Sequence, residues 1–201
     1  YFGQTLGGAD LDGDGADELI VASPGRDTDE SGQGCISILR GGDPLVSGEM
    51  VTDIEDIDFY LDWDNTSICA ETEGTRLGWN ASPQVADFNG DGELDLAIGG
   101  QGTNQVFVFF SIGDSLGGAY DAESDADVVI VSESGPSGFG YALASGDMNG
   151  DGIADLAIGA PDVQDPIDAA FEYYSMMGTE ADTDGKVYLY DGTSLSGALT
   201  E

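Results

Sequence analysis

Short apolar runs alternate with polar, glycine-rich segments along the whole chain. The clearest runs are rich in β-branched and aromatic residues, and they lie at 19–22, 35–39, 96–98, 106–110, 127–131, 156–158 and 186–190. Runs of this length and composition, bounded by Gly, Asp and Asn, are typical of β-strands rather than helices. The pattern therefore predicts an all-β chain built from short strands.

The same acidic phrase stands directly before three of these runs. It reads DLDGDGADE from Asp10, DFNGDGELD from Asp87 and DMNGDGIAD from Asp147. Oxygen-bearing side chains at positions 1, 3, 5 and 9 of the phrase can converge on one hard cation, and the Gly at position 6 permits the sharp turn that this requires. The phrase therefore predicts a metal-binding loop that leads straight into a strand.

Each loop is expected to bind one ion through four side chains and the backbone carbonyl at position 7. The predicted ligands are Asp10, Asp12, Asp14, Ala16 and Glu18 in the first loop, Asp87, Asn89, Asp91, Glu93 and Asp95 in the second, and Asp147, Asn149, Asp151, Ile153 and Asp155 in the third. In the first loop Asp17 is an alternative to Glu18 as the closing ligand.

The chemistry of these ligands favours calcium, with about three sites. All the side chains are carboxylates or amides and the chain has no His, whereas zinc and copper sites use sulfur or imidazole nitrogen. Magnesium requires fewer protein ligands and a stricter geometry. An EF-hand requires Glu at position 12, but that position holds Val21, Ile98 and Ile158.

The similarity between the three segments extends beyond the acidic phrase. Each phrase is preceded by an aromatic residue or Leu followed by Gly, at Phe2, Leu77 and Phe139, and each following run ends in a small-residue turn. The phrases begin at residues 10, 87 and 147. Repeats of this size, made of short strands joined by Gly-rich turns, suit the blades of a β-propeller.

Together, the Phe-Gly pair, the acidic phrase and the Gly-Ala-Pro turn resemble the FG-GAP repeat, which builds the calcium-binding propeller of integrin α subunits. The segment from Phe139 to Pro161 matches that repeat most fully, whereas the second repeat has Leu77 for Phe and Gly99-Gly100 in its turn. The resemblance implies a propeller blade with calcium in a loop between adjacent strands. It does not imply an integrin-like ligand, because such blades serve many proteins.

The domain organisation expected from these repeats is one β-propeller-like unit over 1–201, with repeats at about 1–50, 51–118 and 119–201. Three blades are too few for a closed propeller, which has at least about four, and the chain begins and ends within a repeat. We therefore expect an open unit that belongs to a larger propeller or assembles through its unpaired blade edges. A short helical insertion is expected at 166–178.

The chain is strongly acidic, with 40 Asp and Glu against 4 Lys and Arg and a formal net charge of −36. This charge argues against nucleic acid and anionic membrane surfaces as partners. The sequence also shows no segment predicted to insert into a membrane. The expected partners are calcium and another protein or a second copy of the chain.

Two further features bear on location. Cys35 and Cys69 are the only cysteines and both lie in β-prone stretches, so a disulfide and two buried thiols both fit. Asn65 and Asn80 each begin an N-glycosylation pattern. Calcium sites of this kind suit an extracellular or cell-surface protein.

The leading functional hypothesis is a non-enzymatic, calcium-stabilised extracellular propeller used in adhesion, assembly or scaffolding. The absence of His excludes Ser-His-Asp and Cys-His chemistry. Two alternatives remain open: a propeller part of a larger secreted enzyme, and a subunit of a surface filament.

Overall fold

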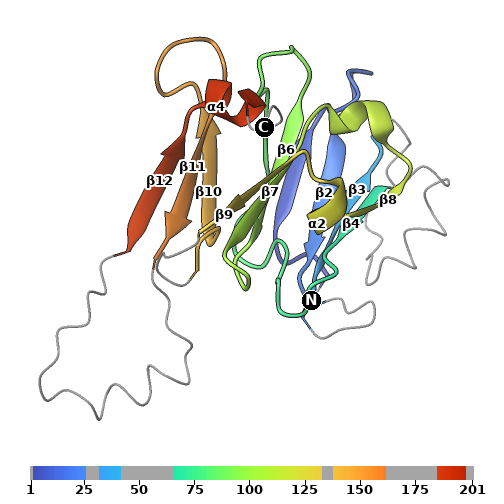
Figure 1. The fold of residues 1–201 in the computed structure, drawn as a ribbon. Coiled ribbons are helices and arrows are strands. Elements are labelled where there is room, and N and C mark those ends of the chain that lie inside the picture. Colours follow the sequence, from blue (N-terminus) through green and yellow to red (C-terminus); the bar gives the residue numbers. More distant parts are fainter. Residues whose placement is uncertain (1, 26–31, 42–65, 133–137, 162–184, 198–201) are drawn as a thin grey trace, which may run out of the picture.

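The computed structural model describes residues 2–25, 32–41, 66–132, 138–161 and 185–197 (Figure 1). Their regular secondary structure is mostly strand, which confirms the all-β expectation; the predicted insertion at 166–178 lies outside them. The strands are β1 (Leu6–Ala9), β2 (Glu18–Ser23), β3 (Cys35–Leu39), β4 (Thr66–Cys69), β5 (Gln84–Ala86), β6 (Asp95–Gly100), β7 (Gln105–Phe109), β8 (Ala119–Asp121), β9 (Val128–Val131), β10 (Ala142–Gly146), β11 (Asp155–Ala160) and β12 (Lys186–Tyr190). The short helices are η1 (Ile112–Ser115), α2 (Ala122–Asp125) and α4 (Gly192–Gly197).

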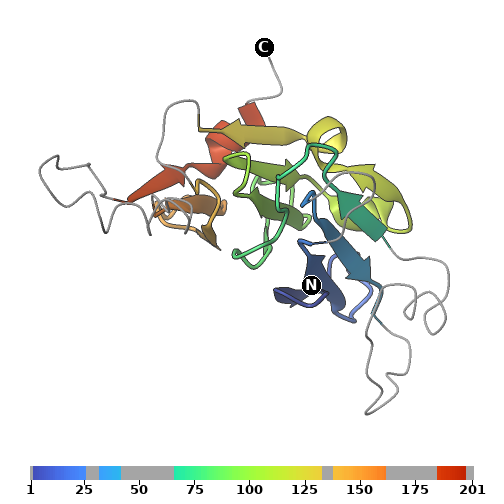
Figure 2. The same ribbon diagram turned by 90° about the horizontal axis from the view of Figure 1, so that it is seen from below.

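The strands build three sheets that stand side by side (Figures 1 and 2). The first has the order β1-β2-β3-β4-β8, the second β5-β6-β7-β9 and the third β10-β11-β12. All neighbouring strands are antiparallel except β4 and β8, which pair in parallel. In each sheet the first two strands are joined by one of the acidic loops.

The sheets are offset from the repeats that the sequence suggests. Strand β4, at Thr66–Cys69, is hydrogen-bonded to β3 in the first sheet, although the repeat division places it in the segment 51–118. In the same way β9, at Val128–Val131, belongs to the second sheet. Each of these two sheets thus takes its fourth strand from the start of the next repeat, which ties consecutive repeats together.

Two apolar layers hold the sheets together. Ile36 and Ile38 of β3 are buried against the second sheet, in a cluster that includes Phe107 and Phe109 of β7. The alternate β7 residues Val106 and Val108 point the other way and pack with Leu156 and Ile158 of the third sheet. Full burial of one such side chain contributes about 1.5–3 kcal/mol, so these layers are the main source of stability.

The Leu-Gly and Phe-Gly pairs of the second and third repeats pack where one sheet contacts the preceding one. Leu77 and Phe139 are fully buried, one in each apolar layer. The glycines that follow them, Gly78 and Gly140, have φ of +71° and +84°, a conformation that L side chains rarely adopt. A Cβ at Gly78 would also lie 2.7 Å from Ile36 Cδ1 in the first sheet. The pair therefore combines an apolar anchor with a close backbone approach.

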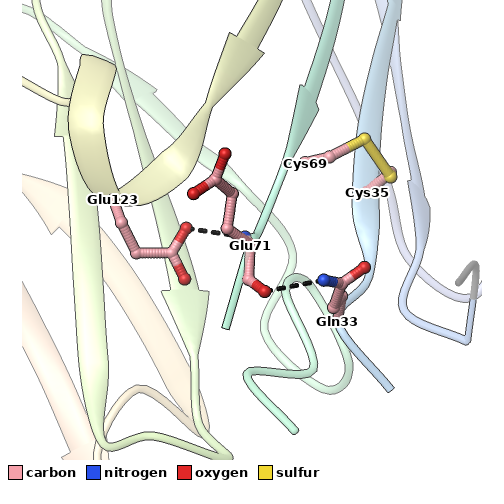
Figure 3. Close-up of a disulfide and its surroundings, with 5 residues drawn as sticks. All are labelled: Gln33, Cys35, Cys69, Glu71 and Glu123. Atoms are coloured by element: carbon pink, nitrogen blue, oxygen red, sulfur yellow. Dashed lines mark hydrogen bonds between the residues drawn. A yellow bond between two sulfur atoms is a disulfide. The ribbon is translucent and has the colours of Figure 1, made fainter. Parts of the chain in front are cut away.

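A disulfide joins Cys35 of β3 to Cys69 of β4 (Figure 3), which answers the question that the sequence leaves open. The two residues are directly opposite in the antiparallel register, with their Cα atoms 4.1 Å apart. Nearby, Glu123 of α2 accepts hydrogen bonds from the backbone N–H of Glu71 at 2.9 Å and of Thr72 at 3.1 Å. The bridge and this carboxylate together fix the outer edge of the first sheet.

Candidate metal centre

The three acidic loops have the same backbone conformation. The glycines at position 6, Gly15, Gly92 and Gly152, have φ of +95°, +93° and +92°. A Cβ built at these three glycines meets no atom within 4 Å. It is therefore the left-handed backbone rather than a lack of space that requires Gly, as the sequence pattern predicts.

The Asp at position 1 turns its carboxylate into the loop. Its Oδ2 accepts the backbone N–H of position 6, from Gly15 to Asp10 at 3.1 Å, from Gly92 to Asp87 at 2.9 Å and from Gly152 to Asp147 at 3.0 Å. The side-chain oxygens at positions 3 and 5 each accept the N–H two residues further on. The predicted side-chain ligands at positions 1, 3 and 5 are thus oriented by the loop itself.

The carboxylate at position 9 has a second role that the sequence does not reveal. Glu18, Asp95 and Asp155 are almost fully buried, with 0–4 % of each residue exposed. Each accepts two backbone N–H groups, one from position 2 of its own loop and one from the second residue after the third strand of its sheet. The donors are Leu11 and Gly41 for Glu18, Phe88 and Ser111 for Asp95, and Met148 and Gly192 for Asp155.

The first loop brings three of its predicted ligands together. One carboxylate oxygen each from Asp10, Asp12 and Glu18 lie within 4.8 Å of one another. Glu18 is buried and points inward, whereas Asp17 is exposed, so Glu18 is the closing residue of this loop. Asp14 is not part of this group, and its Oδ1 accepts the N–H of Ala16 at 2.8 Å.

One atom of this group lacks a hydrogen-bond partner among the described residues. Asp10 Oδ1 is buried and has no hydrogen-bond partner in the part of the chain that the structure describes. A buried carboxylate oxygen without a donor is unfavourable by several kcal/mol unless a cation or water satisfies it. Three converging carboxylates with one unsatisfied oxygen fit a hard divalent cation.

In the second and third loops the residue at position 3 is an amide. Asn89 Nδ2 donates to Asp91 Oδ2 at 2.8 Å, and Asn149 Nδ2 donates to Asp151 Oδ2 at 3.0 Å. The amide therefore holds the carboxylate at position 5 while its own Oδ1 accepts a backbone N–H. These loops carry one predicted ligand carboxylate fewer than the first.

The electrostatics of the second loop also favour a cation. The pKa of Asp95 is raised to about 6, mainly by burial, with hydrogen bonds from Ser111 and Phe88 opposing the shift and the nearby charges of Asp91 and Asp87 adding to it. The backbone N–H of Glu93 holds the pKa of Asp91 below its ordinary value. A divalent ion in the loop would stabilise both carboxylates in their charged form.

The predicted modification sites are placed only in part. Asn65 lies outside the described residues. Asn80 is half-buried, and its Nδ2 donates to Gln101 Oε1 at 2.9 Å. Glycosylation at either residue stays a prediction.

Comparison with protein families accounts for these loops and sheets. The model of the FG-GAP repeat matches residues 2–39 and 139–190, and the model of the FG-GAP-like repeat matches residues 87–158. Together these matches include all three acidic loops. The chain belongs to the FG-GAP repeat family, and its sheets are blades of the β-propeller type.

Large proteins of two kinds are among the relatives. The chain is 30% identical to the phosphatidylinositol-glycan-specific phospholipase D of Dictyostelium discoideum over 80% of the chain and 18% of the relative. It is 26% identical to integrin alpha-PS3 of Drosophila melanogaster over 82% of the chain and 14% of the relative. Mouse integrin alpha-7 is 34% identical over 61% of the chain and 9% of the relative. The chain thus spans less than a fifth of these proteins.

The described helices are all short, and not one of them has the length and apolar character needed to cross a membrane.

Proposed function

We propose that this chain is a calcium-binding segment of an extracellular β-propeller, and that its role is structural, adhesive or in assembly. The observation that carries the proposal is the first loop, in which three carboxylates converge and the buried Asp10 Oδ1 lacks a partner. The second and third loops share its backbone and its closing carboxylate. We therefore assign about three calcium sites, with the ligands at positions 1, 3, 5, 7 and 9 that the sequence analysis names.

The role of calcium in this proposal follows from the two backbone N–H groups that the closing carboxylate at position 9 binds. The carboxylate links position 2 of the loop to the residues that follow the third strand of the same sheet. When bound, the ion supplies the positive charge that lets the loop carboxylates stay ionised next to each other. The loop, the strand entry and the end of the third strand are then fixed as one unit.

The relatives support an extracellular and adhesive setting. Integrin α subunits are among the proteins that the chain resembles, and the proposal of a cell-surface or secreted protein with a protein partner rests on them. A non-catalytic propeller part of a larger secreted enzyme is the second candidate, and the similarity to the phospholipase D favours it. In both cases the three blades themselves carry no catalytic role.

The first test of this proposal is the number of bound ions. Asp87→Ala and Asp147→Ala each remove the position 1 carboxylate, which in the structure accepts the N–H of the position 6 glycine. Each variant is expected to lose one calcium ion of about three, measured by native mass spectrometry. Glu73→Ala, at an exposed residue outside the loops, is the matched control and should keep all ions. Full stoichiometry in both loop variants would mean that these ligands are misassigned.

The assembly role is supported by an apolar face on the third sheet that is exposed in the part of the chain that the structure describes. Lys186 pairs with the last residue of β11, just as Cys35 pairs with the last residue of β2. Val187 and Leu189 of β12 are therefore equivalent to Ile36 and Ile38 of β3. The two residues of β3 are buried against the next sheet, whereas Val187 is 70% and Leu189 68% exposed.

A second copy of the chain provides a matching surface. On the other side of the molecule, Leu6 and Leu19 of the first sheet are 55% and 44% exposed. This is the face that, in the second and third sheets, packs on the preceding sheet. We therefore assign the face of Val187 and Leu189 to the first sheet of a neighbouring copy, in a head-to-tail contact.

Self-association should follow from this contact. In calcium, sedimentation velocity of the 201-residue chain is expected to show species that grow with concentration. Val187→Lys with Leu189→Lys should abolish them, because two charges enter the apolar face, while Val131→Lys at another exposed apolar position should not. A single 20.7 kDa species at all concentrations would rule out this contact.

A further inference from the structure

The residue directly after the third strand of each sheet differs in charge between the three blades. It is basic in the first, aromatic in the second and acidic in the third: Arg40, Phe110 and Asp191. The three positions are equivalent, because in each case the next residue donates its backbone N–H to the closing carboxylate of the loop. The three loops thus share one backbone conformation but lie next to a positive, a neutral and a negative residue.

In the first blade the guanidinium of Arg40 binds a predicted metal ligand. Its Nε and Nη2 donate to Asp12 Oδ2 at 3.1 and 2.9 Å. Asp12 is one of the three carboxylates that converge in this loop. Since calcium lies about 2.3–2.6 Å from its oxygen ligands, an ion bound to Asp12 would lie about 6 Å from the charge of Arg40. The guanidinium therefore competes with the cation.

The ion pair also explains why this loop tolerates an additional carboxylate. Position 3 is Asp12 in the first loop and Asn in the other two. The amide Nδ2 of Asn89 and Asn149 donates to the position 5 carboxylate of the same loop, whereas Asp12 Oδ2 accepts from Arg40. The pair of Asp12 and Arg40 is neutral, as the amide is, so Arg40 cancels the charge that Asp12 adds.

In the third blade the equivalent residue adds negative charge. Asn149 Nδ2 donates to Asp191 Oδ2 at 3.3 Å as well as to Asp151 Oδ2 at 3.0 Å. The carboxylate of Asp191 thus stands next to a predicted ligand without being one of the positions that the repeat pattern names. It raises the negative potential at this loop.

We propose that the residue after the third strand sets the cation affinity of each loop, with Arg40 weakening the first site and Asp191 strengthening the third. The inference rests on the proposed function, since it presupposes that the loops bind calcium. A unit charge about 6 Å from a divalent ion in a water-like dielectric changes the binding constant about tenfold. The third loop should therefore bind calcium more tightly than the first.

Calcium titration of the full chain against a chromophoric chelator resolves the stepwise binding constants. Arg40→Gln is expected to tighten one of the steps about tenfold, and Asp191→Asn to weaken the tightest step about tenfold. Asp191→Arg should weaken that step further, about a hundredfold in total, because the charge is reversed. Circular dichroism of each variant in calcium checks that the fold is kept.

Matched controls separate local from overall charge. Arg76→Gln and Glu73→Gln make the same changes in net charge at the opposite end of the strands, and both should leave all steps within about twofold. Unchanged constants in Arg40→Gln and Asp191→Arg would overturn this inference while calcium binding stands. A chain that takes up no calcium at any step would instead overturn the proposed function.

Discussion

In a strong chelator the chain is expected to melt roughly 15 °C or more below its melting temperature in calcium. An ion present at a hundredfold excess over its dissociation constant contributes about 2.7 kcal/mol. About three such sites together contribute about 8 kcal/mol, and each kcal/mol shifts the melting temperature of a chain of this size by about 2–4 °C. Differential scanning calorimetry measures the shift.

The net charge of −36 demands a control for screening. Any salt reduces the repulsion between exposed carboxylates, so the chelator and calcium samples are compared at equal ionic strength. Calcium should restore the melting temperature, and magnesium should restore much less, because it binds poorly to sites built mainly from protein oxygens. Identical melting curves in chelator and in calcium would show that the ions are not structural.

The strands that the sequence predicts are the ones rich in β-branched and aromatic residues. Strands β3 and β12 occupy the predicted ranges 35–39 and 186–190, and β9 differs from its prediction by one residue. The first strand of each sheet is different. The segments Leu6–Ala9, Gln84–Ala86 and Ala142–Gly146 consist largely of Gly, Ala and polar residues, which have low β propensity. They form strands because the loop and the second strand hold them in register.

The topology at the outer edge of the first sheet could not be predicted for a related reason. Strand β8, at Ala119–Asp121, is only three residues long and pairs in parallel with β4 of the first sheet, far from it in sequence. Its position depends on α2, from which Glu123 binds the backbone after β4. A contact between such distant segments leaves no periodic signal in the sequence.

In the loops, too, the sequence predicts contacts between residues close in sequence but not contacts between distant ones. The spacing of Asp, Asn and Gly predicts the turn conformation, because the hydrogen bonds that the side chains at positions 1, 3 and 5 accept all join residues within one loop. The second N–H bound by each closing carboxylate comes from residues 16 to 37 positions further along the chain. The ion pair of Arg40 with Asp12, 28 residues apart, is of the same kind. Both features appear only when the third strand is placed beside the loop.

The closing carboxylate should therefore be essential even without calcium. Asp95→Ala removes the acceptor for the N–H groups of Phe88 and Ser111, which Asp95 binds at 2.7 and 2.8 Å. A buried donor left without an acceptor costs about 1–3 kcal/mol, so the variant is expected to lose about 2–6 kcal/mol of unfolding free energy in chelator. Urea unfolding followed by circular dichroism measures the loss.

Two companion variants separate this bridging role from metal binding. Glu93, two residues before Asp95, has an exposed side chain of the same charge. Glu93→Ala should change the unfolding free energy in chelator by less than about 0.5 kcal/mol. Asp95→Asn keeps one acceptor oxygen and should lose about half as much stability as Asp95→Ala. If Asp95→Ala were as stable in chelator as Glu93→Ala, the carboxylate would act through the ion alone. If Asp95→Ala instead loses more stability than Glu93→Ala both in chelator and in calcium, Asp95 links the loop to the blade by itself. The bound cation then adds to that stabilisation.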